Sequence, residues 1–517
     1  MLSNPAFSFR VSNQSKNLFE VVSFTGREGI SEIYEFTILL ISEQADVDSA
    51  SMMQGLATFS VNPPFSGESP AVFSGVIVSC EALHRIQDYH LYRVCMRHKF
   101  WRLSLPVFSR VFVDQKPQDF MTTALDDGEM HSGVDYDMRL HGGYRAYDFV
   151  CQYNESAFAF VSRWLESLGI YYWFAHADDG GKCIMADDKS AHAHLGGHEK
   201  CRFAPPSGMA VENPGQIITE FTCATVPVPG KIKLKTYNRQ RPSLDLLCEA
   251  DVRNGGVGTW YYYGDNYLDK EEGQKLAQLR SQELLCQETR FWGVSHNPSL
   301  RPGYLFNLEH HYRQKWNQPY LTVGVLHEGS QSRQVVRHYG IGSLDDADRL
   351  FYRNRFQCIP ADVQYRPPRL TPLPKVAGAV PAVIDAEGTG EFAVIDSQGR
   401  YKVRLPFDIA DRGAGKSSCW IPMMQPYGGA KMGFHAPLHK GTEVLVMFMD
   451  GNPDLPVVAG VVPNPQNPSR VTDTNATRIQ FDSASGQNMH MEDAPGKEHI
   501  LMTSLDGSCV FKIGNIE

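Results

Sequence analysis

The C-terminal tail, Arg478–Glu517, restricts the fold of this chain more than any other segment. It contains pairs of apolar residues two positions apart, as half-buried strands do. Ser-Gly, Pro-Gly and Asp-Gly turns follow one another there at intervals of ten and eleven residues. Such a ribbon exposes its whole apolar face and is at best marginally stable alone. The apolar positions are Ile479, Phe481, Met489, Met491, Ile500, Met502, Phe511 and Ile513.

Two arrangements would cover this apolar face. Three identical tails wound about a common axis would bury it, because each copy would form one wall of a closed prism. The eight apolar residues would then be the core of a trimer. Alternatively, the tail is an ordinary β-meander that packs on the preceding part of its own chain. The residue pattern supports the two interpretations about equally.

The remainder of the chain is predicted to be rich in strands, with few helices. In ESAFAFVSRWLESLG, residues Phe158, Val161, Leu165 and Leu168 share one side of a helix, and Gly169 stands where a glycine ends one. A second helix is predicted within LDKEEGQKLAQLRSQELLCQ, residues 268–287. Alternating segments surround both helices, so the first part of the chain is predicted to hold two β-rich units, each with an associated helix.

A proline-rich stretch, RPPRLTPLPK at residues 366–375, favours extended backbone and is predicted to be a linker. Five or more short strands follow it within about 85 residues, which is typical of a small barrel such as an OB-fold. The predicted strand segments are AVPAVIDAEG, EFAVIDSQGRYKVRLPFD, SCWIPMMQP, TEVLVMFMDG and LPVVAGVV.

Charge and cysteine content limit the classes of function. The net charge of −9 argues against a nucleic-acid binder, which needs a basic surface to displace counterions. The eleven cysteines form no Cys-x-x-Cys pair, so free thiols in a reducing compartment are expected. The first residues, MLSNPAFSFRVSN, lack the basic and apolar regions of a secretory signal, and apolar runs such as VLVMFM are too short to span a membrane.

Several segments carry specific motifs in a fixed order. They are SFTGREGISEIYEF (23–36), YNESAFAFVSRWLESLGIYYWF (153–174), LRPGYLFNLEHH with YLTVGVLHEG (within 300–329), FYRNRFQCIPADVQYRPP (351–368), DSQGRYKVRLPFD (396–408) and GTEVLVMFMDGNPDLPVVAGVVPNPQNP (441–468). In this order, and over nearly the whole chain, they resemble the VgrG spike proteins of the bacterial type VI secretion system. These proteins are related to the hub and spike proteins of contractile phage tails.

The resemblance implies a mainly β fold in three regions. Residues 1–370 would form a β-rich α+β hub with two tube-like barrels and associated helices, and residues 371–468 an OB-fold barrel. Residues 469–517 would begin an intertwined, triple-stranded β-helix needle, or β-prism, in which the tail packs against two copies of itself.

The resemblance also implies a mechanical function, with no catalytic residues and no cofactor. Three chains would present six barrels to the hexameric Hcp tube and adapt it to a threefold needle. The needle would carry a PAAR-type tip and effectors through a target membrane, in contact with baseplate components. Such a protein assembles in the bacterial cytoplasm and leaves without a signal peptide, through the type VI apparatus, to the extracellular space or the target cell.

Three other interpretations remain open at this stage. The segment AHAHLGGHEKC offers His192, His194, His198 and Cys201 as a weak candidate for a zinc site. An OB-type nucleic-acid binder is suggested by Arg400, Lys402 and Arg404 on one strand face. A tail-associated cell-wall hydrolase would need clustered carboxylates in a cleft, and no segment of sufficient length is left unassigned to hold one.

Overall fold

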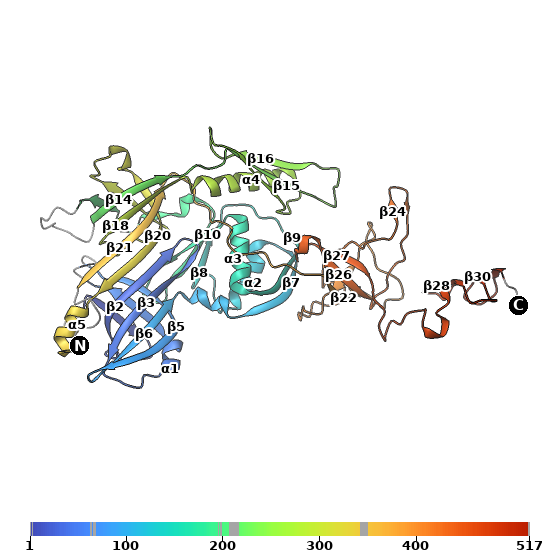
Figure 1. The fold of residues 1–517 in the computed structure, drawn as a ribbon, viewed down its shortest axis with the longest axis horizontal. Helices are drawn as coiled ribbons and strands as arrows, with labels where there is room; N and C mark the ends of the chain where they lie inside the picture. The colour runs from blue at the N-terminus through green and yellow to red at the C-terminus, as the bar shows by residue number, and fades with distance from the viewer. Residues whose placement is uncertain are drawn as a thin grey trace. The chain divides into compact units, whose positions relative to one another are not determined.

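The computed structural model describes residues 2, 4–62, 65, 69–194, 196, 199–205, 217–341 and 350–514. About 43% of the residues lie in strands and 14% in helices, which confirms the mainly β fold class. The chain forms two compact units. The first comprises Met1–Phe108, Lys116–Ala146 and Asn154–Leu373, and the second comprises Ser109–Gln115, Tyr147–Tyr153 and Pro374–Glu517 (Figure 1).

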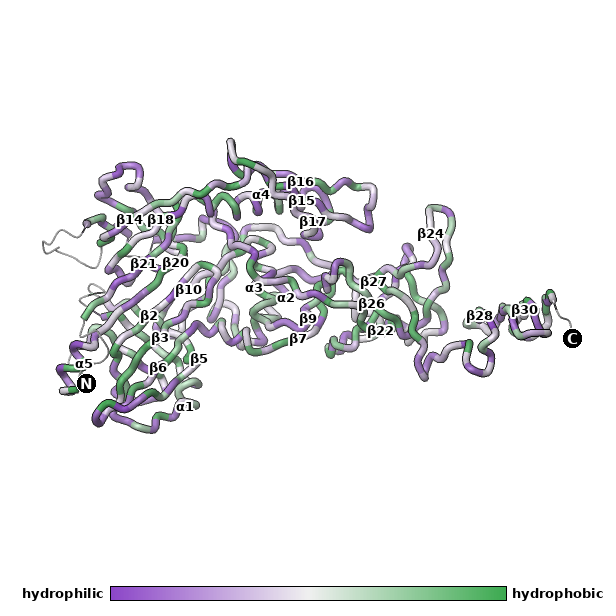
Figure 2. The backbone as a smooth tube through the Cα atoms, in the orientation of Figure 1, coloured by the Kyte–Doolittle hydropathy of each residue, from purple (hydrophilic) through white to green (hydrophobic). Residues whose placement is uncertain are grey.

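Six N-terminal strands of unit 1 form a curled sheet in the order β1-β4-β5-β6-β3-β2, and β1 also lies against β2. Residues along β3 alternate between buried and partly exposed positions. Figure 2 shows hydrophobic and hydrophilic stretches following one another along these strands. Rings of Phe36, Phe59 and Phe73 fill the interior. The strands are β1 (Phe7–Val11), β2 (Glu20–Gly29), β3 (Glu32–Ser42), β4 (Leu56–Val61), β5 (Ala71–Ile86) and β6 (Tyr89–Arg97).

A second set of six strands closes into a barrel, because β19 pairs with both β13 and β20. Its core contains Phe221, Phe291, Tyr320 and Phe356. The strands, in sheet order, are β20 (Pro319–Ser330), β21 (Phe351–Pro360), β18 (Thr289–Ser295), β14 (Ile217–Thr225), β13 (Lys200–Phe203) and β19 (Tyr304–Glu309). The short strand β12 (Ala193–His194) pairs parallel with β19.

Strands β2 and β20 join the two sets into a single sheet. They pair antiparallel from Ser23↔Ser330 to Gly29↔Gly324, although the two strands lie far apart in the sequence. The sequence predicted two β-rich units in this part of the chain, and the structure adds that their backbones are hydrogen-bonded together. The smaller sheets of unit 1 are β10-β11-β8 (Tyr171–Ala175, Lys182–Ala186, Tyr136–Arg139) and β16-β15-β17 (Leu246–Asp251, Lys231–Thr236, Thr259–Tyr263).

Both predicted helices are present. Helix α3 (Ala157–Leu168) is capped by the Ser156 side chain and ends at Gly169, whose φ of 69° is left-handed. Helix α4 (Lys270–Leu285) begins at the cap residue Asp269 and packs on β15 and β16. The other helices are α1 (Ser49–Gln54), α2 (Pro117–Asp126) and α5 (Ser332–Tyr339).

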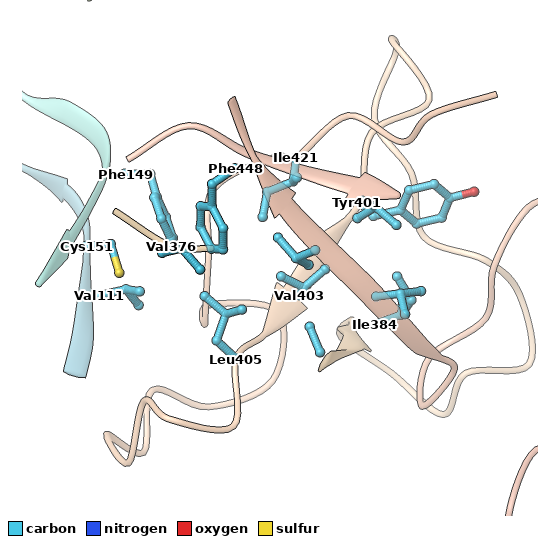
Figure 3. Packing of buried hydrophobic residues seen from close by; sticks show 14 residues of the cluster. Val111, Phe149, Cys151, Val376, Ile384, Tyr401, Val403, Leu405, Ile421 and Phe448 are labelled. Carbon is cyan, nitrogen blue, oxygen red and sulfur yellow. The ribbon is translucent and has the colours of Figure 1, made fainter. Parts of the chain in front are cut away.

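Unit 2 contains the predicted small barrel, built on the sheet β23-β22-β26-β27. Its core includes Val403, Ile421 and Val446, and also Val111 and Cys151 from β7 and β9 (Figure 3). These two strands come from the first part of the chain, far ahead of the barrel in the sequence. The elements are β7 (Val107–Gln115), β9 (Tyr147–Ser156), β22 (Ala379–Asp385), β23 (Lys402–Arg404), β24 (Gly428–Gly429), β25 (Met432–Gly433), β26 (Glu443–Phe448) and β27 (Pro456–Val461).

Two predicted strand segments of the barrel differ in the structure. SCWIPMMQP, residues 418–426, makes only isolated bridges among the described residues, Tyr401↔Ile421 and Met423↔Val458. The segment EFAVID, residues 391–396, has no ladder partner in the described part of the chain, and Phe392 is 75% exposed. Alternating apolar residues suit the half-buried face of a sheet. A strand also needs a neighbour that hydrogen-bonds to its backbone N–H and C=O groups. The predicted linker contains the boundary between the two units, at Leu373 and Pro374.

All eleven cysteines are free, as predicted, and six of them are buried. Within the described ranges, we find no helix that combines the length and the hydropathy of a membrane span.

Candidate functional site

The tail folds into a four-stranded antiparallel sheet whose register places all eight predicted core residues on one face. Ile479, Met491, Ile500 and Ile513 are successive cross-strand partners and form one row. Phe481, Met489, Met502 and Phe511 form the second row in the same way. The strands are β28 (Arg478–Asp482), β29 (Asn488–Glu492), β30 (His499–Thr503) and β31 (Val510–Gly514).

This apolar face is uncovered in the single chain. Its eight residues are between 37% and 65% exposed, whereas core residues of the neighbouring barrel are exposed by a few per cent at most. Contiguous apolar surface of this kind marks an interaction site. The turns that produce the register contain Gly486, Gly496 and Gly507, each with a positive φ that other residues rarely adopt.

The opposite face of the tail is mostly polar, with Leu501 and Val510 as apolar members, and contains an ion pair of its own. Arg478 donates to Glu492 across the β28–β29 pair at 2.9 Å. Hydrogen bonds from Thr477 and Arg478 lower the pKa of Glu492 to about 2, so its carboxylate is charged at neutral pH. The two faces therefore differ in chemistry, and only the apolar one lacks a partner within the described chain.

The residues of the proposed zinc site do not converge. The Nδ1 of His192 donates to the carbonyl of Gly303 at 2.7 Å, and its ring stacks on Tyr171. The Nδ1 of His194 lies 3.1 Å from the carbonyl of Leu305, and Cys201 is buried in the core of the closed barrel. His198 lies outside the described residues. Among the described residues, no three metal-ligating side chains lie close enough to share an ion.

His192 predicts a pH dependence of stability. Burial lowers its pKa from 6.5 to about 4, and its Nε2 has no hydrogen-bond partner among the described residues. Below about pH 6.5 the unfolded chain binds a proton here that the folded chain does not. The associated stability is therefore complete above that pH and is lost as the pH falls, by about 1.4 kcal/mol per unit.

Replacing His192 by Asn preserves a donor towards Gly303 but removes this proton. Urea unfolding should show that His192→Asn loses about 1.4 kcal/mol less than the native protein between about pH 6 and about pH 5. If the free energy of unfolding falls equally in the two proteins, His192 does not contribute to the pH dependence of stability.

Two members of the basic stripe of the OB barrel, Arg400 and Lys402, make contacts within the chain, whereas the third, Arg404, is exposed. Arg400 pairs with Asp396 at 2.6 Å. The ammonium group of Lys402 donates to the carbonyl of Gly415 and lies 5.1 Å from the centre of the Trp420 ring. Tyr401 is fully buried. A binder of single-stranded nucleic acid needs free cations and exposed rings, and Arg400, Lys402 and Tyr401 do not supply them.

Sequence reasoning missed a buried charged cluster inside unit 1. Glu28 of β2 accepts from the Nε2 of His176 at 2.5 Å and from the Nε2 of His327, on β20, at 2.9 Å. Burial alone would raise the pKa of Glu28, but the two histidines hold it well below its usual value. The three residues are far apart in the sequence, so no local motif predicts the cluster.

Residues 27–333, more than half of the chain, match the model of the phage tail baseplate hub family (GPD). The chain belongs to this family. A second match covers residues 392–462 and describes the injector OB domain of type VI secretion systems and phage baseplates. Together the two matches confirm the hub and the OB-fold that the sequence predicted.

Relatives of this hub protein confirm the resemblance to VgrG spike proteins. The type VI secretion system spike protein VgrG1b of Pseudomonas aeruginosa is 27% identical over 489 residues, which cover 92% of this chain and 64% of that protein. The actin cross-linking toxin VgrG1 of Vibrio cholerae is 28% identical over 417 residues, 78% of this chain and 36% of the toxin. The chain thus spans less than two thirds of the length of these relatives.

Solved structures show the same fold. The Escherichia coli c3393 protein, a type VI secretion component described as similar to the T4 tail proteins gp27 and gp5, superimposes with a TM-score of 0.63 at 21% identity. That match covers 88% of this hub protein and all of c3393. A chain of the Francisella PdpA–VgrG complex matches with a TM-score of 0.65 at 8% identity, over 98% of this chain and 78% of that one.

Proposed function

We propose that this chain is the trimeric spike of a type VI secretion tube, and that the apolar face of the tail is its trimer core. The observation that supports this proposal best is the register of β28–β31. It gathers eight exposed apolar side chains on one face and leaves the other face mostly polar. Two further copies, each with the same face, provide a cover of matching shape and chemistry.

The free energy available from this face is sufficient for assembly. Fully burying a large apolar side chain contributes about 1.5–3 kcal/mol. Eight residues that are roughly half exposed could therefore contribute on the order of 6–12 kcal/mol per copy. An alternative in which the tail packs on its own barrel would lower these exposures in the single chain, and they are high.

Membership of the hub family and the similarity to VgrG spike proteins support the rest of the proposal. The hub, residues 1–370, adapts the hexameric Hcp tube to threefold symmetry, and the OB barrel, 371–468, connects it to the needle that begins at 469–517. The needle carries a PAAR-type tip and effectors and pierces the target membrane, while the hub contacts baseplate components. The role is mechanical rather than enzymatic, and the chain leaves the cytoplasm through the type VI apparatus.

Light scattering after size exclusion tests the central claim. We expect a mass near three times the 58.0 kDa of one chain. A mass near 58.0 kDa across the micromolar range would contradict the proposal, because the tail face would then have no partner of its own kind.

A further inference from the structure

Strand β17 exposes an unusual row of aromatic side chains. Its sequence is Thr-Trp-Tyr-Tyr-Tyr, and every residue is exposed: Trp260 by 37%, Tyr261 by 53%, Tyr262 by 39% and Tyr263 by 55%. It lies at the end of the sheet β16-β15-β17, whose strands β15 and β16 contact helix α4 (Figure 1). Its outer edge is unpaired in the described part of the chain.

The two faces of β17 differ in their neighbours but not in their aromatic character. Trp260 and Tyr262 stand beside Ile232 and Leu234 of β15, on the side of the sheet that α4 covers. Tyr261 and Tyr263 stand beside Lys233 and Lys235, on the other side. Exposed edge strands are usually protected against pairing with another chain by a lysine, a proline or a β-bulge. Strand β17 contains none of these.

The patch is also uncharged overall, although lysines lie next to it. Lys233 pairs with Glu249 at 2.7 Å, and Lys231 pairs with the same carboxylate at 3.2 Å. Lys235 lies 3.6 Å from Asp245. Phosphate groups of nucleic acids or lipids would have to compete with these acids. Tyrosine and tryptophan without net charge are typical of the central part of a protein–protein interface.

The size of the patch limits the kind of protein that can cover it. The rings of Tyr261 and Tyr263, which share one side of the sheet, offer about 200 Å² if each aromatic side chain presents about 200 Å² when free. A stable interface between freely diffusing proteins needs about 800 Å² from each partner. The patch therefore suits a partner that is already held nearby.

We propose that β17 packs against a second copy of this chain, as a contact between neighbouring hubs of the trimer. The inference rests on the proposed function, because the tail is what brings the copies together. Tethering raises the effective concentration of a neighbour to the millimolar range, so an additional contact of modest area becomes populated. In a cyclic trimer the contact is heterologous, and β17 therefore meets a different surface of its neighbour rather than another β17.

Hydrogen exchange on the full chain tests this contact. The reference is a chain with Met491→Asp and Met502→Asp in the tail, which is expected to be monomeric. Amides of residues 259–263 should exchange at least about tenfold more slowly in the native trimer than in this reference. If the native protein has the trimer mass but these amides exchange equally fast in both, the inference fails and the trimer stands. A single-chain mass for the native protein would instead refute the proposed function.

A variant of the patch provides an independent measurement. Tyr261→Ser with Tyr263→Ser alters two exposed side chains, and its trimer should dissociate at a concentration at least about tenfold higher than the native trimer. Tyr312→Ser is the matched control, because Tyr312 is 70% exposed and lies elsewhere in unit 1. If the trimer of the double variant dissociates at the same protein concentration as the native trimer, the inference is overturned.

Discussion

Replacing Met491 and Met502 by aspartate in the same chain should reduce the solution mass from three times 58.0 kDa to 58.0 kDa. The two residues lie on adjacent strands, in different rows of the apolar face. In a trimer they would place six carboxylates around the axis, without cations on that face to pair with. Each buried ion costs several kcal/mol, which exceeds what the remaining apolar residues can recover.

The control for this experiment places the same charges outside the apolar face. The control variant carries Thr503→Asp and Leu505→Asp. Thr503 follows Met502 directly and lies on the opposite face, and Leu505 lies two residues further on, in an exposed turn. This variant should keep the trimer mass. If both double variants remained trimeric with unchanged melting temperatures, the tail could not be the trimer core.

The tail could be predicted in detail because its information is local. Alternation with period two assigns each side chain to a face, and glycine turns at Gly486, Gly496 and Gly507 fix which residues face each other. The sequence therefore identified the face and all eight of its members. It left open which partner covers them, since the pattern is the same for a meander and for a trimer.

Other features depend on contacts between distant segments and have no local signal. Val111 and Cys151 contribute to the core of the OB barrel, although each lies in an ordinary alternating strand of the first part of the chain. The same holds for Glu28, which is 148 residues from His176 and 299 from His327. The segment 391–396 shows the converse, because a local strand pattern found no ladder partner among the described residues. A local residue pattern therefore predicts which face of a strand is buried, whereas the order of the strands in the sheet determines what packs against it.

The buried cluster around Glu28 predicts the second large effect. Glu28→Gln should lower the free energy of unfolding of the hub by about 3–5 kcal/mol, the usual cost of removing one member of a buried ion pair. Glu28 is 5% exposed and is the acidic partner of two histidines. It also acts on the buried guanidinium of Arg301, which donates to the carbonyl of Val72 and lies over the Phe73 ring. Without the carboxylate, this cation has lost its nearby negative charge.

A neighbouring glutamate, Glu32, provides an exposed control for the buried Glu28. Glu32 pairs with Arg27 at 2.8 Å, but both side chains are about half exposed or more, so Glu32→Gln should cost less than about 1 kcal/mol. Urea unfolding of the three proteins measures the difference. Losses that agree within about 0.5 kcal/mol would show that the cluster does not stabilise the hub. A large and selective loss in Glu28→Gln would instead mean that the junction of β2 and β20, which joins the two six-stranded sets, depends on a buried charge.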